Sequence, residues 1–184
     1  MIVNPDDVLS YWFAPRPERM ARWFGGDAAT DADCRRRFAS TLNAAARGEL
    51  DDWTTTPRGR LALIVVLDQF SRNVHRGTSR AFAQDARALA LCLDGLARGD
   101  DRALAPEERA FFYLPLEHAE DAAMQARSVA CFEALAAEAP EQSEFLPWAR
   151  EHRDMIARFG RFPSRNVTLG RRSTPDEEAF LAGG

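Results

Sequence analysis

Apolar residues recur along the chain with the three- and four-residue spacing of α-helices, and no alternating run bounded by hairpin turns competes with them. The most hydrophobic stretch, residues 61–70, is apolar nearly all round. It follows Thr56 and Pro57, a capping residue and a first-turn proline that together open a helix. The pattern predicts an all-α protein with this helix buried at its centre.

Capping residues, prolines and glycines set the expected limits of the other helices. Asn4 caps a helix that begins at Pro5, and Gly48 is expected to end the helix that Thr30 caps. The expected helices cover about residues 4–13, 18–24, 30–47, 56–70, 80–98, 106–115, 117–138, 143–159 and 174–181. Because short loops join them, we expect roughly seven to nine helices packed as antiparallel hairpins.

Length and charge are those of one globular domain spanning residues 1–184, since 46% hydrophobic content in a chain of this length allows a sizeable core. The net charge of −4 and the pI near 5.5 argue against a nucleic-acid or anionic membrane surface, because phosphate binding needs clustered positive charge. The N-terminus carries no signal-peptide pattern, and no apolar run reaches membrane-spanning length. We therefore expect a cytoplasmic protein that binds neither nucleic acid nor membrane, of undetermined oligomeric state.

Several kinds of chemistry are excluded by residues and motifs that the sequence lacks. All 24 basic residues are arginine, so Schiff-base chemistry, a covalent pyridoxal site and a phosphate-loop lysine are excluded. The dinucleotide, nucleophile-elbow, zinc-protease and di-iron motifs are also missing. Any activity must use a less conspicuous site, and we expect no cofactor.

Metal ligands of the thiol and imidazole type are few and do not have ligand spacing. They are Cys34, Cys92, Cys131, His75, His118 and His152. We expect no metal site and three reduced cysteines. His152 lies in a run of charged residues that is typical of a solvated helix face.

The first candidate polar group is at the end of the central helix. Asp68 is costly to bury unless it is paired, and Arg72, four residues on, can reach it on the same helix face. Asp68 could orient Arg72 toward an anion. Alternatively, Asp68, Arg72 and Asn73 could cap the helix end and satisfy its free carbonyl groups. Both interpretations stay open from the sequence.

The second candidate group is the arginine-rich segment 158–172, which includes Arg161, Arg165 and Asn166. Guanidinium groups in an irregular segment suit bidentate binding of a carboxylate or phosphate, but cations after a helix also complement its dipole. No repeat period stands out along the chain. The one internal echo is between residues 71–74 and 164–167, both of which read Ser-Arg-Asn-Val.

His118 is the third candidate. It follows Pro115 closely and has Glu117, Glu120 and Asp121 as neighbours, so it could act as a general acid or base with Glu120 orienting it. The alternative is that these acids lie in the first turn of the next helix and that His118 is a hydrogen-bonded, partly buried residue. The aromatic cluster Tyr11, Trp12, Phe13, Trp23 and Phe24 is expected to be core packing.

Three spaced blocks of the sequence form a recognisable pattern. They are Leu67-Asp68-Gln69-Phe70-x-Arg72-Asn73, then Glu108-Arg109 with Tyr113-Leu114-Pro115-Leu116 and His118-x-Glu120-Asp121, then Arg158-Phe159-Gly160-Arg161-Phe162-Pro163-x-Arg165-Asn166 with Leu169-Gly170-Arg171. Together they resemble the bacterial family known as domain of unknown function number 924. The resemblance covers essentially the whole chain. It implies an all-α, tetratricopeptide-like superhelix and no established activity.

The resemblance also implies which polar positions matter. The positions that recur in the family match Asp68, Arg72, Asn73, His118, Glu120, Arg161, Arg165 and Asn166. This chain has Ser164 and Ala119 where the family pattern often has His and Ser. If those two positions carry acid–base chemistry in the family, that activity is not expected of this chain; the effect of the two departures stays open from the sequence.

Three classes of function follow from these candidates. The leading hypothesis is an intracellular helical domain that binds a small anion or an acidic peptide end in a polar cleft. That cleft would be formed by the two Arg-Asn loops, with the ligand-binding residues Asp68, Arg72, Asn73, Arg161, Arg165 and Asn166. The alternatives are an enzyme that uses His118 and Glu120 beside that anion site, and a protein-interaction scaffold.

Overall fold

The computed structural model describes residues 1–183, and every regular element in that range is a helix. In chain order the α-helices are α1 (Pro5–Trp12), α2 (Glu18–Met20), α3 (Ala28–Ala46), α4 (Pro57–Ile64), α5 (Ser71–Val74), α6 (Asp85–Arg98), α7 (Pro106–Glu117), α8 (Ala122–Glu138), α9 (Phe145–Phe159) and α10 (Pro175–Ala182). Of these described helices, nine have four or more residues. The all-α prediction is confirmed, and the number of helices agrees with it.

Shorter helical turns connect several of these helices. Two are π-helical, Ala21–Gly25 and Val65–Phe70, and five are 3₁₀ turns. The 3₁₀ turns are Asp51–Thr55, Ser79–Phe82, Asp100–Ala103, Pro140–Gln142 and Pro163–Arg165. Since α4, the second π-helical turn and α5 follow one another without a break, residues 57–74 form one continuous helix, here called the central helix.

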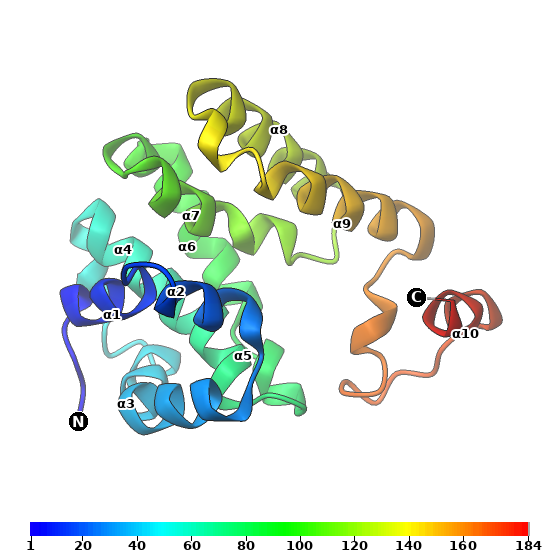
Figure 1. The fold of residues 1–184 in the computed structure, drawn as a ribbon, viewed down its shortest axis with the longest axis horizontal. Coiled ribbons are helices and arrows are strands. Elements are labelled where there is room, and N and C mark those ends of the chain that lie inside the picture. The colour runs from blue at the N-terminus through cyan, green and yellow to red at the C-terminus, as the bar shows by residue number, and fades with distance from the viewer. Residues whose placement is uncertain (184) are drawn as a thin grey trace.

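The helices form a body with an extended C-terminal part (Figure 1). Helices α8 and α9 lie side by side as a hairpin, and α7 packs against α8 on the other side. The segment after α9, residues 160–183, leads to α10 and is called the C-terminal segment below. Among residues 1–183, none of the helices combines the length and apolar character that crossing a membrane requires.

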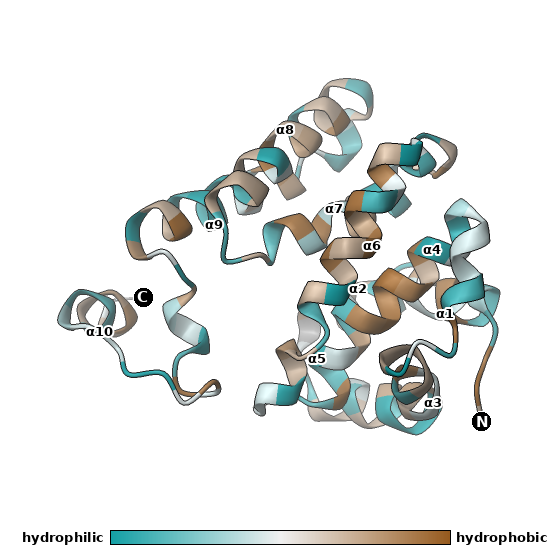
Figure 2. Cartoon of the chain, turned by 180° about the vertical axis from the view of Figure 1, so that it is seen from behind, coloured by the Kyte–Doolittle hydropathy of each residue, from teal (hydrophilic) through white to brown (hydrophobic). Residues whose placement is uncertain are grey.

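Hydropathy follows this arrangement. In Figure 2, brown hydrophobic segments gather on the helices at the centre of the molecule, whereas the outer helices mix brown and teal. Helix α9 shows this mixture along its length, with buried Ala149 and Ile156 among exposed charged residues. An amphipathic helix of this kind buries one face only, so its other side chains are available to solvent or to a cavity.

Several element boundaries differ from those expected. Helix α3 begins at Ala28 because the carboxylate of Asp27, and not Thr30, accepts the free backbone N–H groups of the first turn at 2.9 Å. Helix α7 continues through Pro115 to Glu117, so α8 begins only after Asp121. Pro115 lacks the backbone N–H that would bond to the carbonyl of Phe111, and α7 ends two residues after it.

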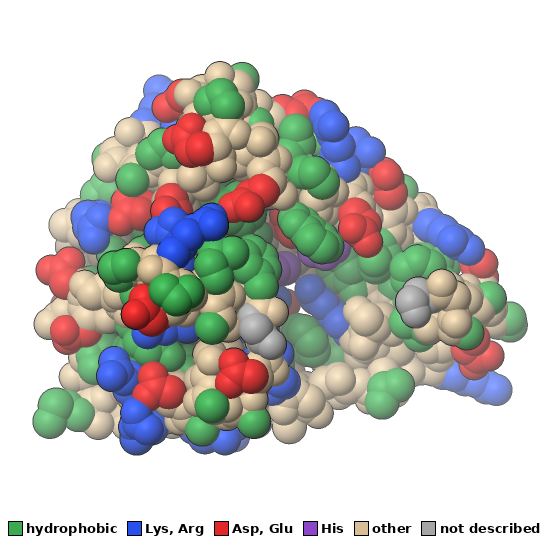
Figure 3. Space-filling view, viewed as in Figure 1, with side chains coloured by type: hydrophobic (Ala, Val, Ile, Leu, Met, Phe, Trp, Pro, Cys, Tyr) green, Lys and Arg blue, Asp and Glu red, His purple; other side chains and the backbone are tan. Residues whose placement is uncertain are grey.

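One face of the molecule is hollowed. Figure 3 shows a depression between the helical body and the C-terminal segment, with histidine side chains and an arginine or lysine side chain visible inside it. Since the chain has no lysine, the blue side chain is an arginine. Charged side chains otherwise cover the outer surface of this face as a mixture of both signs.

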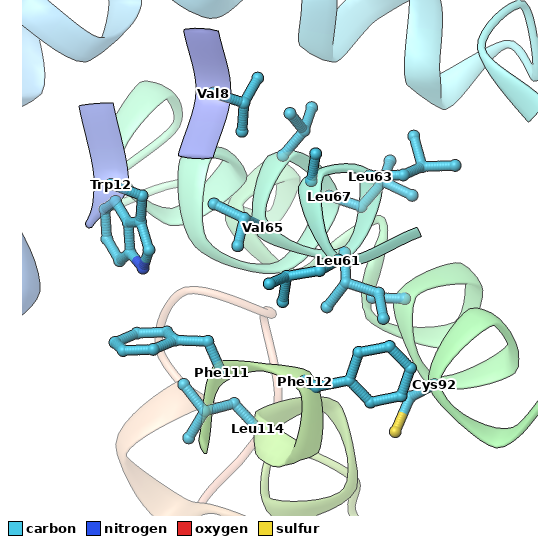
Figure 4. Close-up of a cluster of buried hydrophobic side chains, with 14 of the residues drawn as sticks. Val8, Trp12, Leu61, Leu63, Val65, Leu67, Cys92, Phe111, Phe112 and Leu114 are labelled. Atoms are coloured by element: carbon cyan, nitrogen blue, oxygen red, sulfur yellow. The ribbon is translucent and has the colours of Figure 1, made fainter. Parts of the chain in front are cut away.

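The central helix forms the core. Leu61, Leu63 and Leu67 have no exposed surface, and Figure 4 shows them on the central helix, with Trp12 of α1 and Phe112 of α7 packed on other sides of it. Full burial of a leucine stabilises the fold by about 1.5–3 kcal/mol. The prediction of a central, fully buried helix is therefore confirmed. Two residues on α7, Phe111 and Leu114, extend this core to the hollow in the surface.

Close approach of α6 depends on one glycine. A Cβ atom on Gly95 would lie 2.5 Å from the ring of Phe112 and 2.6 Å from Cδ of Arg60, nearer than such atoms can pack. Arg60 is itself almost fully buried and pairs with Asp100 at 2.8 Å. The absence of a side chain at Gly95 thus lets α6 pack directly on the central helix and α7.

Candidate functional site

A cavity of about 310 Å³ lies where α7, α9, the central helix and the π-helical turn after α2 meet. Its apolar wall consists of Trp23, Phe24, Phe111, Leu114, Phe145 and Trp148. The exposed fractions of Phe24 and Trp148 are 58% and 55%, so these two rings form the part of the wall that reaches solvent. The expectation that Phe24 belongs to the core is wrong. A largely apolar cavity of this size is typical of small-molecule sites.

The polar lining of the cavity comes from three helices. Gln69 and Arg72 extend from the central helix, Glu117 and His118 from the end of α7, and His152 from α9. A few converging polar groups on an apolar wall can orient a bound molecule.

Three larger surface hollows, of about 430, 550 and 520 Å³, lie elsewhere on the described part of the chain. Their described linings include no histidine. In the first of them, the charges of Arg19 and Glu107 are paired at 2.7 Å. The cavity with the two histidines is therefore the candidate functional site.

Helices α7 and α9 present the same side-chain pattern to the cavity. In α7 the lining residues Phe111 and Leu114 precede His118, and in α9 Phe145 and Trp148 precede His152. Both sets have the spacing i, i+3, i+7, which places all three positions on one helix face. A glutamate precedes each histidine, and equivalent positions are 34 residues apart, the period of tetratricopeptide repeats.

His118 is held by Asp68. The imidazole Nδ1 lies 2.8 and 2.9 Å from the two carboxylate oxygens of Asp68, which is fully buried. Gln69 Nε2 donates a further hydrogen bond to Asp68 at 2.6 Å. Because an ionised carboxylate only accepts hydrogen bonds, His118 Nδ1 must carry the proton, and Nε2 is the nitrogen left for the cavity.

The charge of Asp68 is stabilised in place. Burial alone would raise the pKa of Asp68, but the Arg72 guanidinium and His118 outweigh it and hold that pKa well below its usual range. The predicted pair of Asp68 and Arg72 is confirmed, with 3.2 Å between Arg72 NH1 and Asp68 Oδ1. Asp68 therefore remains an ionised partner for His118 across the neutral pH range.

A π-helical turn shapes this end of the central helix. Residues 65–70 are wound in this wider form, and Ser71 Oγ donates to the carbonyl of Leu67 at 2.6 Å. Arg72 also donates to the carbonyl of Asp68. Such turns often occur at functional sites. Both π-helical turns of the described chain border the cavity, one through Gln69 and one through Trp23 and Phe24.

The two arginines of the Arg-Asn segments meet at one carboxylate. Arg72 binds Asp85 through two hydrogen bonds of 3.0 and 3.1 Å, and Arg165 lies 3.4 Å from the same carboxylate. Burial raises the pKa of Asp85 and the Asp68 charge adds to the rise, while Arg72 opposes it. Arg165 also stacks over the rings of Phe82 and Phe162, at 4.8 and 4.4 Å.

The asparagines of the same segments lie elsewhere. Asn73 donates a hydrogen bond of 2.9 Å to Asp31 of α3, and Asn166 donates to Ser173 and Glu177 of the C-terminal segment. Neither asparagine is among the residues that line the cavity. The structure thus brings the two arginines together and leaves the two asparagines apart.

Arg161 and Glu120 hold the C-terminal segment. Arg161 forms two hydrogen bonds with Glu177, at 2.6 and 2.7 Å. Glu120 accepts two hydrogen bonds from Arg171 and one from the backbone N–H of Phe162. Burial would raise the pKa of Glu120, but these hydrogen bonds lower it. Glu120 therefore lies in a structural contact, and no hydrogen bond joins it to His118 in the described structure.

His152 and Glu117 form a second histidine–carboxylate pair that the sequence analysis did not identify. Nδ1 of His152 lies 2.7 Å from Oε1 of Glu117, within ion-pair distance but not aligned for a hydrogen bond. The His152 ring packs edge-on against Phe162 at 5.1 Å. The expectation of a solvated helix face at His152 is therefore wrong. The stripe of Phe145, Trp148 and His152 was the available signal.

The remaining sequence candidates lie outside the cavity. Ala119 accepts a hydrogen bond from Gln125 through its carbonyl, and Ser164 is exposed. Within the described residues, no three His, Cys, Asp or Glu side chains are placed to hold a metal ion. Burial raises the pKa of the Cys34 thiol to about 12, so this cysteine is not a ready nucleophile.

Comparisons with known proteins agree with this fold. A family model described as a bacterial protein of unknown function, DUF924, matches residues 8–184. A solved structure of a protein of unknown function from Agrobacterium tumefaciens is similar, with 40% sequence identity, a TM-score of 0.88, and coverage of 98% of this chain and 97% of that one. No curated protein matches the chain. The chain belongs to the DUF924 family of bacterial proteins of unknown function.

Proposed function

We propose that this protein is an enzyme that binds a small, largely apolar molecule in the aromatic cavity and uses His118 as its general base. The observation that carries this proposal is the pairing of His118 with the fully buried Asp68 at the wall of that cavity. A carboxylate that holds Nδ1–H fixes the ring and stabilises the imidazolium that forms when Nε2 takes a proton.

The lining residues limit the type of reaction. None of the described side chains around the cavity is Ser, Thr, Cys or Lys, so the lining supplies no alkoxide, thiolate or amine nucleophile. His118 Nε2 would therefore remove a proton from a water molecule or directly from the bound molecule. Gln69 donates a hydrogen bond to Asp68 and would help hold the carboxylate in position against His118.

Anion binding between the two Arg-Asn loops, the leading hypothesis from the sequence, has less support. Both Arg72 and Arg165 already contact Asp85, and Arg161 is engaged by Glu177. An anion would have to displace a carboxylate from these arginines. The proposed enzyme keeps Arg72 as a structural partner of Asp68.

The scaffold alternative rests on the tetratricopeptide-like stacking that the family resemblance implies. The 34-residue offset between α7 and α9 supports that stacking. However, the cavity has a volume of only about 310 Å³, and two histidines that are paired with carboxylates line it. A peptide-binding scaffold needs an extended groove. A cytoplasmic location remains part of this proposal on the grounds of sequence alone.

Isotope labelling tests the reaction without knowledge of the substrate. The protein is incubated with a bacterial metabolite extract in H₂¹⁸O and, separately, in D₂O, and new mass shifts are recorded by mass spectrometry. Activation of water would transfer ¹⁸O to a product, and proton abstraction from carbon would introduce deuterium. We expect such labels with the wild type and their loss in His118→Gln.

His75→Gln is the matched control, because His75 lies at a different hollow and does not line this cavity. It should label the same compounds as the wild type. Labels that persist unchanged in His118→Gln, or a complete lack of protein-dependent labelling by the wild type, would overturn the proposal.

A further inference from the structure

Glu117 lies in an unusual position for a carboxylate. Only 3% of the residue is exposed, yet it lines the cavity at the end of α7. Its Oε2 atom is buried and has no hydrogen-bond partner, and its Oε1 atom has only His152 Nδ1 nearby, at 2.7 Å. A buried carboxylate is costly unless hydrogen bonds or a positive charge compensate it.

The charges around the cavity do not supply that compensation. Arg19, which lies over the Trp23 ring, is paired with Glu107 at 2.7 Å. Arg72 and Glu117 line the cavity; Asp68, Asp85 and Arg165 do not, but they join Arg72 in one charged network whose guanidinium groups are Arg72 and Arg165. Both guanidinium groups contact Asp85, and Arg72 also contacts Asp68. Glu117 is left with His152 and its sequence neighbour His118, which are positive only when protonated.

The aromatic wall of the cavity also favours a positively charged ligand. Five aromatic rings surround the space beside Glu117, including Trp23 and Trp148. The face of an aromatic ring carries negative potential, so a cation within about 6 Å of several rings is stabilised, most strongly by tryptophan. An aromatic enclosure with one buried carboxylate is the arrangement that binds amines and quaternary ammonium groups.

We propose that the molecule bound in this cavity is a small organic cation, an amine or quaternary ammonium compound on a compact apolar body. Its cationic group lies against the aromatic rings beside the Glu117 carboxylate, and its remaining atoms extend toward His118. This inference rests on the proposed function, for which it names the substrate class.

Matched ligands of different charge test the inference on the unmodified protein. The probes are choline with its neutral isostere 3,3-dimethylbutan-1-ol and the anion 3,3-dimethylbutanoate, and phenethylamine with 2-phenylethanol and 3-phenylpropanoate. Dissociation constants come from NMR titration, with the indole signal of Trp148 as the local reporter. We expect at least one cation to bind about tenfold or more tightly than its neutral partner.

The same charge preference should depend on Glu117. In Glu117→Gln, which keeps the shape and removes the charge, the affinity for the cation should fall to that of the neutral partner. Glu151→Gln is the matched control, because Glu151 occupies the equivalent position before His152 but is exposed. It should leave both affinities unchanged. If Glu117→Gln fails to fold, the wild-type comparison alone decides.

The inference is overturned if neither cation binds more tightly than its neutral partner, or if an anion binds best. Its failure is distinguishable from failure of the proposed function. If a cation is preferred but no isotope label depends on His118, the protein binds cations and the proposed enzymatic function is wrong. If the labels require His118 but appear only on neutral or anionic compounds, the proposed enzymatic function holds and the proposed substrate class is wrong.

Discussion

The cavity and the C-terminal segment both depend on buried or half-buried carboxylates, but these carboxylates have different partners. In the C-terminal segment, Arg161 binds Glu177 and Arg171 binds Glu120, each through two hydrogen bonds, and the second pair joins the segment to the loop after α7. At the cavity, Asp68 engages only one nitrogen of the His118 ring.

The two regions differ in whether both oxygens of these carboxylates have hydrogen-bond partners. His118 Nε2 and Glu117 Oε2 have no hydrogen-bond partner among the described contacts, and both residues line the cavity. A polar atom without a partner at the wall of a cavity is costly, and a functional role is one explanation for it. Substitutions in the two networks should therefore have different effects on stability.

The largest expected effect is the loss of Asp68. Asp68→Ala would leave Arg72 and His118 without their buried carboxylate and should lower the free energy of unfolding by roughly 3–5 kcal/mol, the cost of breaking a buried ion pair. Urea denaturation measures it. Asp176→Ala, which breaks an exposed pair with Arg158, should cost less than about 1 kcal/mol. Equal costs for the two variants would contradict the distinction.

A smaller loss in the free energy of unfolding is expected when His118, the partner of Asp68, is replaced. His118→Ala removes one hydrogen bond to a charged carboxylate and should cost about 1.5–3 kcal/mol in the same urea experiment. The cost stays below that of Asp68→Ala because Gln69 and Arg72 still contact the carboxylate. A larger loss from His118→Ala than from Asp68→Ala would mean that the histidine is chiefly structural.

Arg165 connects the C-terminal segment to Asp85 near the cavity, and its loss should lower the free energy of unfolding by less than the loss of Asp68. Its contacts are a 3.4 Å approach to Asp85 and stacking on Phe82 and Phe162, so Arg165→Gln should cost about 1–2 kcal/mol, the scale of a partly desolvated cation–π contact. Thermal unfolding measures the change. A loss as large as that of Asp68→Ala would show that the C-terminal segment is part of the central core.

Acid should loosen the C-terminal segment locally. Hydrogen bonds from Arg161 and from the backbone N–H of Thr174 lower the pKa of Glu177 from 4.5 to about 2. The ionised form is thus favoured in the folded chain, and its stabilisation is present above pH 4.5 and is lost as the pH falls toward 2. We expect the NMR signals of residues 161–182 to change first in this range. Core signals that disappear before them would contradict this order.

The sequence predicted the central helix and its ion pair because both depend on local rules. A run that is apolar all round has no solvated face, and Asp68 and Arg72 are four residues apart on one helix. The repeated Arg-Asn segments predicted the site less accurately, because only their arginines lie together. Consecutive helical residues point about 100° apart, so Arg72 faces Asp85 while Asn73 faces α3.

The rest of the site depends on tertiary packing. Asp85 meets Arg72 only because α6 packs beside the central helix, and His152 meets Glu117 only because α9 packs beside α7; no local pattern specifies those contacts. The extension of α7 through Pro115 also moved Glu117 from an expected first turn to a last turn. The 34-residue echo that ends at His118 and His152 was readable in the sequence and would have identified the second histidine.

The protonation of the His118 ring tests the central claim most directly. Long-range ¹H–¹⁵N NMR, recorded at a pH where the ring is neutral, distinguishes the two tautomers. We expect a proton on Nδ1, from which Asp68 accepts a hydrogen bond at 2.8 Å, and an unprotonated Nε2 whose nitrogen shift changes when a ligand enters the cavity. A proton on Nε2, or an Nε2 shift that no cavity ligand alters, would contradict a general base at this position.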